Sequence, residues 1–280
     1  MSVNEPPPIP VPRADKKLGQ HYLNDKKIIQ KICFDFDQDC KSILEIGPGP
    51  GILTETLAEH KRPFNVIEKD KRFLDNLKQF LSGDQILFTD ALEVDLVDFL
   101  RSQGHHEDVW LVSNLPYNIS APLIIRFLQV PTLKYMTLMM QKEVGEKIFN
   151  WSGKNRPKQM GSLMALCQQY YDISLNTHVP PGAFSPPPKV DSVVLSFVRK
   201  EHPSIDLSYF ATYESFLKKL FAQRRKQIGN NIKGHFDRDR FEEGLNQLGR
   251  KITDRSEVLT VEEMAKLFHF VVLDPYKERI

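Results

Sequence analysis

The sequence predicts an α/β fold of the doubly wound, Rossmann-like class, with an antiparallel hairpin at the sheet edge and a small helical domain at the C-terminus. Short apolar, β-branched segments alternate with helical segments along the first half of the chain, as in a parallel sheet covered by helices. A glycine-rich turn follows the first of these strands. Beyond about residue 204 the chain is helical and poor in strands.

Seven strands and the helices between them are expected. The five strands of the parallel part lie at 42–46, 64–67, 85–88, 109–112 and 135–140. The helices lie at 52–60, 72–81, 121–128 and 143–149. Two more strands, 171–178 and 190–199, are separated by Pro180-Pro181-Gly182 rather than by a helix, so we expect them to form the hairpin. Near the C-terminus, Thr260 and Glu263 have the spacing of a capping box.

Composition and the pattern of expected helices and strands suggest three parts: a disordered proline-rich leader at 1–15, the Rossmann-like domain at 16–204 and the helical domain at 205–280. Hydrophobic residues make up 41% and charged residues 26%, which is typical of soluble globular proteins. No apolar run reaches the roughly 18–20 residues of a membrane span, and the N-terminus lacks the apolar core of a signal peptide. The net charge of +2 says little about partners.

The three cysteines, Cys33, Cys40 and Cys167, are far apart and form no Cys-x-x-Cys pair. This pattern argues against a disulfide framework or a zinc site and fits a cytoplasmic protein. His105 and His106 are adjacent in a polar loop without a third ligand, so solvated side chains explain them better than a metal does. We therefore expect no metal and no membrane partner.

The turn after the first strand reads Gly47-Pro48-Gly49-Pro50-Gly51. Glycines at this point let the backbone turn sharply and approach a ligand, which makes Gly47 and Gly49 candidate contacts. The spacing is neither the Gly-x-Gly-x-x-Gly of dinucleotide enzymes nor a P-loop. The two prolines also remove N–H donors that a pyrophosphate would need. The loop favours a ligand without phosphates, while a plain strand-to-helix turn is the alternative.

Acidic residues end the next two strands. Glu68 follows the second strand at the distance where an acid bonds ribose hydroxyls, and Asp90 ends the third strand. Asp90 can accept a hydrogen bond from an adenine amine, and Ala91 leaves room for the flat ring. Each acid alone is explained as well by solvent exposure at a strand end. Together, beside the same loop, they favour an adenosine site, and adenosine without phosphate suggests S-adenosylmethionine.

Four motifs in family order resemble those of the ribosomal RNA adenine dimethyltransferases, most closely the KsgA branch that acts on small-subunit (16S) rRNA. The resemblance covers about residues 16–270. The motifs are Leu18-Gly19-Gln20-His21-Tyr22-Leu23-Asn24-Asp25, Glu45-Ile46-Gly47-Pro48-Gly49, Asn114-Leu115-Pro116-Tyr117-Asn118-Ile119-Ser120 and Phe184-Ser185-Pro186-Pro187-Pro188-Lys189-Val190-Asp191-Ser192.

The resemblance implies a Rossmann-like S-adenosylmethionine-dependent methyltransferase domain. Its cofactor contacts would be His21, Leu23, Gly47, Glu68, Asp90 and Asn114. The chain departs from the family at His21, where Asn is usual, and at Tyr22, where Phe is usual. A backbone contact at residue 21 survives this exchange, whereas a side-chain contact depends on it.

The chemistry explains the motif around Asn114. An adenine amine is a poor nucleophile, and two acceptors can aim its lone pair at a methyl group. The acceptors would be the side-chain oxygen of Asn114 and the carbonyl of Leu115, which Pro116 positions. Orientation of this kind contributes about 7–11 kcal/mol. Tyr117 would stack on the target base, with Phe184 as the second face, unless both are ordinary core aromatics.

A basic surface is expected in the C-terminal domain. Leu217, Phe221, Ile228 and Ile232 recur at helical spacing and predict an apolar stripe. The basic residues expected to contact RNA lie off this stripe: Lys218, Lys219, Arg225 and Lys226. Lys189, near the active-site mouth, is expected to contact RNA as well. Arg224 falls near the apolar stripe and is expected to pair internally. A merely solvated charged face is the alternative, because several acids follow closely.

The leading hypothesis is an enzyme that dimethylates the N6 amines of two adjacent adenosines near the 3′ end of small-subunit rRNA, within a pre-ribosomal small subunit, and so takes part in ribosome biogenesis. Two alternatives stay open: a large-subunit rRNA methyltransferase of the macrolide-resistance type, and a non-catalytic assembly factor. A nicotinamide oxidoreductase is disfavoured by the spacing of the glycines. Nothing indicates an obligate oligomer, so we expect a monomer.

Overall fold

The computed structural model describes residues 9–15, 18–150 and 160–274, so the first eight residues of the expected leader lie outside it. The chain divides into two compact units. The first comprises Met1–Gly145 and Ser174–Val198, and the second comprises Glu146–Ile173 and Arg199–Ile280. The second unit thus contains a segment around residue 160 that the sequence-based boundaries assign to the Rossmann-like domain. Among the described residues no helix has the length and apolar character needed to cross a membrane.

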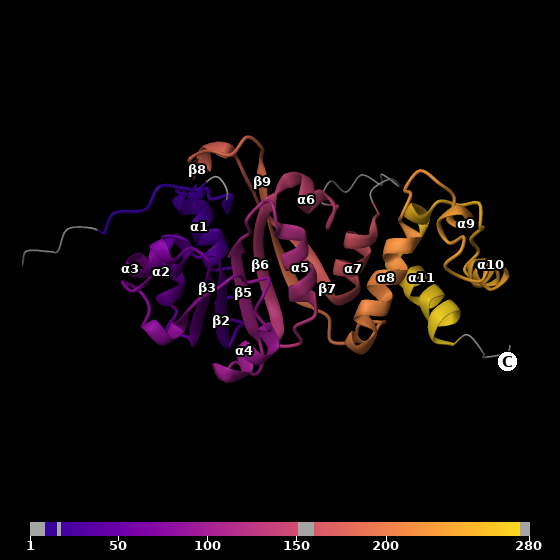
Figure 1. Ribbon diagram of the computed structural model, residues 1–280, viewed down its shortest axis with the longest axis horizontal. Coiled ribbons are helices and arrows are strands. Elements are labelled where there is room, and N and C mark those ends of the chain that lie inside the picture. Colours follow the sequence, from indigo (N-terminus) through magenta and orange to yellow (C-terminus); the bar gives the residue numbers. More distant parts are fainter. Residues whose placement is uncertain (1–8, 16–17, 151–159, 275–280) are drawn as a thin grey trace, which may run out of the picture. The chain divides into compact units, whose positions relative to one another are not determined.

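A seven-stranded mixed sheet forms the first unit, in the order β4-β3-β2-β5-β6-β9-β7 (Figure 1). Strands β2 to β6 run parallel, and β9 is antiparallel to β6. The strands are β2 (Ser42–Ile46), β3 (Phe64–Glu68), β4 (Ile86–Phe88), β5 (Val109–Asn114), β6 (Leu133–Gln141), β7 (Tyr171–Val179) and β9 (Ser192–Arg199). All seven expected strands are confirmed, as is the doubly wound class with its edge hairpin.

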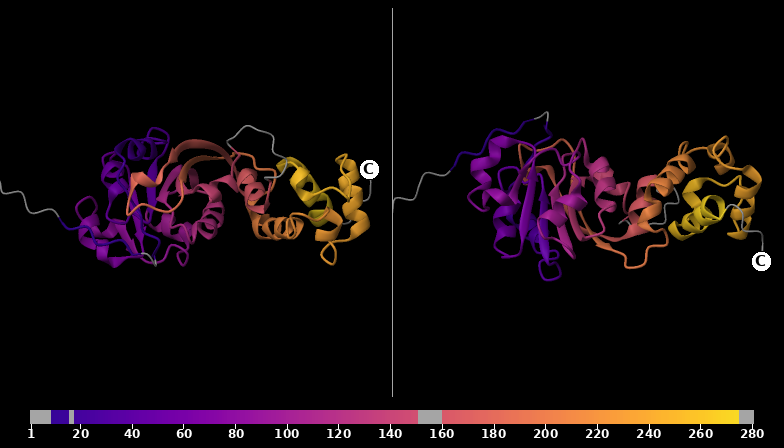
Figure 2. Two further views of the ribbon diagram at one scale, coloured as in Figure 1. Left: turned by 90° about the horizontal axis from the view of Figure 1, so that it is seen from above. Right: turned by 60° about the horizontal axis from the view of Figure 1, so that its bottom comes forward.

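Helices lie on both faces of the sheet, as Figures 1 and 2 show from three directions. They are α1 (Lys26–Cys33), α2 (Ile52–Ala58), α3 (Leu74–Leu77), α4 (Leu96–Ser102), α5 (Ser120–Leu128) and the short α6 (Lys142–Glu146). The expected helix at 72–81 is wrong in length, because its first turn is a 3₁₀-helix (Lys71–Phe73) and α3 ends at Leu77. Asp70 caps this segment by accepting from the amide of Arg72.

One face of the sheet builds the main core with α1, α2 and α3. Alternate strand residues such as Ile43, Val66 and Trp110 pack there against Ile32 and Leu57 of the helices. The intervening residues point to the other face and are equally buried, for example Leu44, Leu111 and Leu138. Burial on both faces explains why these strands read as continuous apolar runs. The same burial fixes the register that brings the strand ends together.

A small second sheet was not expected from the sequence. Strand β1 (Tyr22–Leu23) pairs antiparallel with β8 (Phe184–Ser185), with Leu23 opposite Phe184. The segment between β7 and β9 is therefore more than a turn. It reaches back to the N-terminal segment, and the amide of Asn24 donates to the carbonyl of Ala183 over 2.8 Å. This pairing places the motif that contains Tyr22 and Leu23 beside the motif that begins at Phe184.

The described part of the second unit is mainly helical, and Figures 1 and 2 show its gold and yellow part as helices joined by loops. The helices are α7 (Ser162–Tyr170), α8 (Phe210–Leu220), α9 (Ile228–Asn231), α10 (Arg238–Gln247) and α11 (Val261–Phe268). Aromatic rings pack at its centre, where Phe216 stacks on Tyr213 and Phe241 and Phe268 meets Tyr213 and Phe216 edge-on. The capping box of Thr260 and Glu263 at the start of α11 is confirmed.

The expected apolar stripe of the second unit is buried, but it does not follow one helix. Leu217, Phe221, Ile228 and Ile232 are all at most 8% exposed. Helix α8 nevertheless ends at Leu220, where its last carbonyl accepts hydrogen bonds from Asn231 and Ser256. These side-chain donors satisfy the helix end and turn the chain toward α9.

Gly51 makes a testable contribution to the stability of the first unit. Its φ is 93°, and an added Cβ would lie 2.9 Å from the ring of Phe80. We expect Gly51→Ala to destabilise the protein, by about 1–2 kcal/mol for the left-handed backbone alone and by more through the contact with Phe80. Urea unfolding measures the change. Gly83→Ala is the control, because an added Cβ there meets nothing within 4 Å; equal stability of the two variants would contradict the account.

Candidate active site

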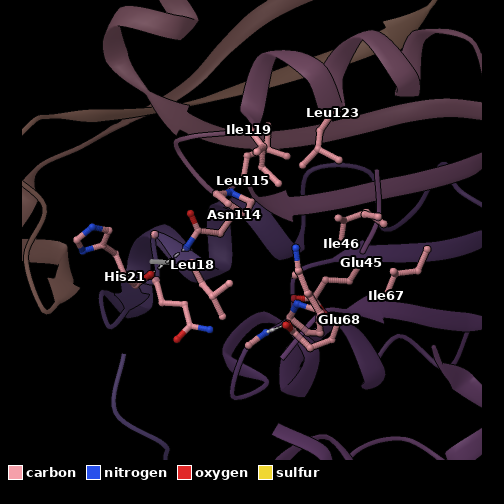
Figure 3. Close-up of a pocket in the computed structure, with 18 of the residues that line it drawn as sticks. Leu18, His21, Glu45, Ile46, Ile67, Glu68, Asn114, Leu115, Ile119 and Leu123 are labelled. Atoms are coloured by element: carbon pink, nitrogen blue, oxygen red, sulfur yellow. Dashed lines mark hydrogen bonds between the residues drawn. The ribbon is translucent and has the colours of Figure 1, made fainter. Parts of the chain in front are cut away.

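A pocket opens at the carboxyl ends of β2, β3, β4 and β5, where a doubly wound sheet binds its ligand. Figure 3 shows side chains from β2, β3 and the loop after β5 around this cavity, with Leu18 and His21 of the N-terminal segment beside them. Its lining includes every cofactor residue expected from the sequence: His21, Leu23, Gly47, Gly49, Glu68, Asp90, Ala91 and Asn114. Within the described part of the chain no group of three acidic, histidine or cysteine side chains could hold a metal.

The glycine loop forms the floor between β2 and α2. Gly47, Gly49 and Gly51 all have positive φ, between 57° and 93°, a conformation that favours glycine. The amide of Gly47 donates to the carbonyl of Ile67 over 2.9 Å and ties the loop to β3. An added Cβ at Gly47 would meet nothing within 4 Å, so at this position the glycine faces open space. A ligand can thus approach the backbone closely.

Glu68 closes the loop from the end of β3. One carboxylate oxygen accepts from the amide of Gly49 over 2.9 Å, and the other accepts from the amide of Asp70 over 2.7 Å. Burial raises the pKa of Glu68, and these two amides oppose the rise by stabilising the charged form. Each carboxylate oxygen keeps a lone pair beyond these bonds. The carboxylate can therefore hold the loop and accept from a pair of ribose hydroxyls at once.

Asp90 lies beyond β4 and forms an ion pair with Lys69 over 2.6 Å. Its other oxygen accepts from the amide of Leu92 over 2.9 Å. The hydrogen bond from Lys69 is the largest cause of a lowered pKa at Asp90, so the carboxyl is ionised and ready to accept from an amine. Ala91 is 8% exposed and adds no bulk beside it. This corner accommodates a flat heterocycle carrying an exocyclic amine.

Glu45, on β2, is a pocket residue that sequence reasoning missed. Its carboxyl is 1% exposed and accepts a hydrogen bond of 2.7 Å from the hydroxyl of Thr54. Burial raises the pKa of Glu45 to about 8, so the carboxyl is neutral at pH 7. A carboxyl inside an otherwise apolar strand is the sequence signal that could have found it. The nearby carboxyl of Glu68 adds to this rise in the pKa of Glu45.

Asn114 ends β5, and its amide has a defined orientation. The Nδ2 group donates to the backbone carbonyl of His21 over 3.1 Å, which leaves the Oδ1 atom as the acceptor for a ligand (Figure 3). The amide of Leu115 donates to Met139 on β6 over 3.0 Å, so the backbone after Asn114 is anchored to the sheet. The amide of Ile119 then donates to the carbonyl of Pro116 over 3.1 Å, which closes a turn that leads into α5.

Tyr117 lines the pocket, whereas Phe184 does not. The hydroxyl of Tyr117 shares a hydrogen bond of 2.5 Å with Ser192 at the start of β9, which fixes the ring. Phe184 is 3% exposed and packs in the main core, so in this structure it is a core aromatic rather than an open face for a base. The imidazole of His21 stacks on the ring of Tyr117, at 5.6 Å between centroids.

The N-terminal segment covers the pocket through a polar network that the sequence did not predict. Gln20 donates to Asp70 over 2.9 Å and accepts from the amide of Asp15 over 2.8 Å. Arg72 pairs with Asp70, and the hydrogen bond between them is the largest cause that lowers the pKa of Asp70 to about 2. This network ties Asp15 and Gln20 to the segment after β3, and Leu18 lies in the pocket lining.

The candidate RNA-binding residues are all at the surface, but they differ in environment. Lys218 pairs with Glu214 over 2.6 Å, and Lys219 lies over the ring of Phe236 at 5.4 Å. Lys189, in the first unit, is exposed, as are Arg225 and Lys226 in the turn after α8. Arg224, also exposed, donates to the backbone carbonyl of Met160.

His105 corrects an expectation. It is 3% exposed rather than solvated, and its Nε2 atom lies 2.6 Å from the side-chain oxygen of Asn65 on β3. Burial is the largest cause of a lowered pKa, so the ring is neutral and structural. The pair of adjacent histidines thus separates into one core residue and one exposed residue, His106.

Comparison with known proteins identifies the family. A model described as "Ribosomal RNA adenine dimethylase" matches residues 11–272. The chain belongs to the ribosomal RNA adenine dimethylase family. It is 36% identical over 265 residues to "Ribosomal RNA small subunit methyltransferase A" of Geobacter metallireducens, covering 91% of this chain and 94% of that protein. The protein of the same name in Staphylococcus haemolyticus is 35% identical, with 90% and 88% covered.

Solved structures show the same fold. A dimethyladenosine transferase from Plasmodium falciparum superimposes with a TM-score of 0.68 at 22% identity, covering 89% of this chain and 96% of that one. The 23S rRNA methyltransferase ErmE gives a TM-score of 0.65 at 24% identity, with 89% and 99% covered. Both likenesses extend over 89% of this chain and show that its fold is shared by these two solved structures.

The buried carboxyl of Glu45 predicts a pH dependence of stability. Its pKa is raised from 4.5 in the unfolded chain to about 8 in the folded protein. The stability that this group contributes is complete below pH 4.5 and is lost as the pH rises toward 8, with a slope of at most about 1.4 kcal/mol per pH unit.

Glu45→Gln keeps an acceptor for Thr54 and removes the titration. We expect the unfolding free energy of the variant, relative to the wild type, to increase from pH 5 to pH 8 and then to level off. Denaturant unfolding at each pH measures it. Glu55→Gln, at an exposed position of α2, serves as control and should show no such trend. A pH-independent difference for Glu45→Gln would show that the carboxyl is charged when folded.

Proposed function

We propose that the protein transfers methyl groups from S-adenosylmethionine to the N6 amines of two adjacent adenosines near the 3′ end of small-subunit rRNA, forming dimethyladenosine at each. The observation that carries this proposal is the Asn114 amide at the pocket, whose Nδ2 donates to the His21 carbonyl and so leaves Oδ1 as the acceptor, with Leu115 next to it in the lining. The substrate would be a pre-ribosomal small subunit in the cytoplasm, and the enzyme would act as a monomer.

The residues of the pocket fit the methyl donor. Glu68 offers carboxylate lone pairs at the ribose position, Asp90 offers an acceptor for the adenine amine, and Ala91 leaves the ring plane free. The glycine loop brings backbone close to the ligand without phosphate-binding amides, because Pro48 and Pro50 have no N–H. When bound, S-adenosylmethionine supplies an electrophilic methyl group on a sulfonium centre.

The chain's own contribution to methyl transfer would be orientation. The Oδ1 atom of Asn114 and the carbonyl of Leu115 accept the two protons of the adenine amine and turn its lone pair toward the methyl group. No strong base is needed, because the positively charged product nitrogen releases its proton readily. Tyr117, fixed by Ser192, would stack on the base and restore part of the stacking that it loses on leaving the RNA.

The small-subunit substrate is favoured by the curated relatives. Proteins named ribosomal RNA small subunit methyltransferase A align over about nine-tenths of both chains at 34–36% identity. The large-subunit enzyme ErmE matches as a structure at 24% identity, a level that supports the fold alone. An intact Asn114-Leu115-Pro116-Tyr117 motif at the pocket also favours an enzyme over a non-catalytic assembly factor.

Substrate choice is tested by tritiated methyl transfer to purified undermethylated small subunits and to large subunits. We expect incorporation only into small subunits, at paired adenosines that block primer extension near the 3′ end. Incorporation into large subunits alone would overturn the assignment.

Asn114→Ala separates catalysis from binding. The variant loses the acceptor that aims the amine, so we expect methyl transfer to fall by about 100-fold or more, as for other preorganised hydrogen-bonding groups. Binding of the small subunit, measured by co-sedimentation, should persist. The exposed Asn24 provides the control, and Asn24→Ala should transfer methyl groups at the wild-type rate. Full transfer by Asn114→Ala would exclude the mechanism.

A further inference from the structure

Part of the pocket wall comes from the N-terminal segment, which lies between the chain after β3 and the loop after β5. On the first side, the Nε2 group of Gln20 donates to Asp70 over 2.9 Å. On the second side, an added Cβ at Gly19 would lie 3.5 Å from the side-chain oxygen of Asn118. Leu18, Gly19 and Gln20 all line the pocket. Residues 18–20, here called the wall segment, therefore close the cofactor site from outside the main sheet.

The side-chain amide of Gln20 holds the wall segment through both of its polar atoms. Its nitrogen donates to Asp70, and its oxygen accepts from the amide of Asp15 over 2.8 Å. The hydroxyl of Tyr22 and the guanidinium of Arg72 also donate to this oxygen, over 3.2 and 3.4 Å. Because donors face the oxygen and a carboxylate faces the nitrogen, the orientation of the amide is fixed.

Asp70 and Arg72 anchor Gln20 to the chain after β3. The Nε group of Arg72 donates to both carboxylate oxygens of Asp70, over 2.9 and 3.0 Å, and its Nη1 group donates to the carbonyl of Arg13 over 3.3 Å. Charged hydrogen bonds of this kind are stronger than neutral ones. The Asp70 side chain is 6% exposed and that of Arg72 is 47% exposed. Asp70 is thus the fixed half of the pair, whereas water can compete for Arg72.

Tyr22 adds a contact that the phenylalanine usual at this position in the family would lack. Its hydroxyl donates to the carbonyl of Pro12 over 3.1 Å or to Gln20. The ring meets Phe73 edge-on, at 6.2 Å between centroids, and lies 4.0 Å from the position of an added Cβ at Gly49. Tyr22 therefore connects the chain before the wall segment to Gln20 and to the glycine loop.

The same cluster is joined to a cofactor residue and to the chain before the wall segment. The backbone amide of Asp70 donates to the carboxylate of Glu68 over 2.7 Å. The carbonyl of Asp15 accepts from the amides of Leu18 and Gln20 over 3.1 and 3.3 Å. These connections are hydrogen bonds and an ion pair near the surface, so the wall segment can separate from them by a local opening that leaves the core folded.

We propose that Gln20, Tyr22, Asp70 and Arg72 form a latch that holds the wall segment closed over S-adenosylmethionine, and that opening of this latch controls the release of S-adenosylhomocysteine. The four side chains are positioning residues, because they act on the wall segment and not on the reacting atoms. Each methyl transfer consumes one S-adenosylmethionine, so the latch opens between transfers. The latch rests on the proposed function for its cofactor.

Three variants of the full-length protein test the latch. Arg72→Met removes the guanidinium, Arg72→Lys keeps a cation beside Asp70, and Tyr22→Phe removes only the hydroxyl. Lys71→Met is the matched control, because it removes a charge from the neighbouring exposed position of the same 3₁₀-helix.

Three measurements are made on each protein. Dissociation of tritiated S-adenosylhomocysteine, followed by rapid filtration, gives the release rate. Hydrogen–deuterium exchange at the amides of Leu18 and Gln20 without ligand reports the latch itself. Thermal unfolding reports the fold.

We expect Arg72→Met to release S-adenosylhomocysteine about tenfold faster than the wild type, and Tyr22→Phe about threefold faster, because charged hydrogen bonds contribute more than neutral ones. Arg72→Lys should lie between Arg72→Met and the wild type. In ligand-free Arg72→Met, the amides of Leu18 and Gln20 should exchange about tenfold faster. Lys71→Met should match the wild type in all three measurements.

The latch is refuted if Arg72→Met and Lys71→Met release S-adenosylhomocysteine at the same rate. Faster release with unchanged amide exchange would instead assign Arg72 a direct effect on the ligand. A lowered unfolding midpoint of Arg72→Met, together with wild-type release by Tyr22→Phe, would assign the effect to lost stability and also overturn the latch. If the wild-type protein binds no S-adenosylhomocysteine, the proposed function falls with the latch, whereas normal binding with equal release by all variants refutes the latch alone.

Discussion

The hydrogen bond from the Asn114 side-chain amide to the His21 carbonyl sets the geometry of the candidate active site. It joins the end of β5 to the N-terminal segment, which are 93 positions apart in the chain. Because the donor nitrogen is occupied, the amide oxygen is the atom left for a substrate amine. The same bond fixes the backbone of residue 21, and with it the starting point of β1 and of the imidazole over Tyr117. The orientation of the acceptor and the position of residue 21 beside Tyr117 are thus set by one contact.

The carboxyl groups that line the pocket differ in their surroundings and in their tendency to ionise. Glu68 and Asp90 present carboxylates whose remaining lone pairs can bind hydroxyl and amine donors. Glu45, deeper in the sheet, is neutral because burial outweighs its one hydrogen bond. Ionisation of Glu45 beside Glu68 would place two like charges in a poorly solvated site. Keeping Glu45 protonated avoids this repulsion, at the cost of stability at high pH.

Sequence alone predicted the sheet and the location of the site, because both follow from local signals. Strands buried on both faces appear as apolar runs, and parallel strands must bring Gly47, Glu68 and Asn114 to one edge. Contacts between distant segments left no such signal. The β1–β8 pairing, the burial of Phe184 and the position of the His21 ring each depend on two pieces of chain more than 150 residues apart. His105 was misjudged for the same reason, since its partner Asn65 lies on β3, 40 positions earlier in the chain.

The most direct test replaces Asn114 by Asp, which keeps an oxygen acceptor and removes the Nδ2 donor to His21. Undermethylated small subunits are incubated with each protein, and their nucleosides are then quantified by mass spectrometry. The wild-type protein should form dimethyladenosine in small-subunit rRNA, and Asn114→Asp should form almost none while still binding S-adenosylhomocysteine. Equal amounts of dimethyladenosine from both proteins would contradict the central claim that this hydrogen bond orients the catalytic amide.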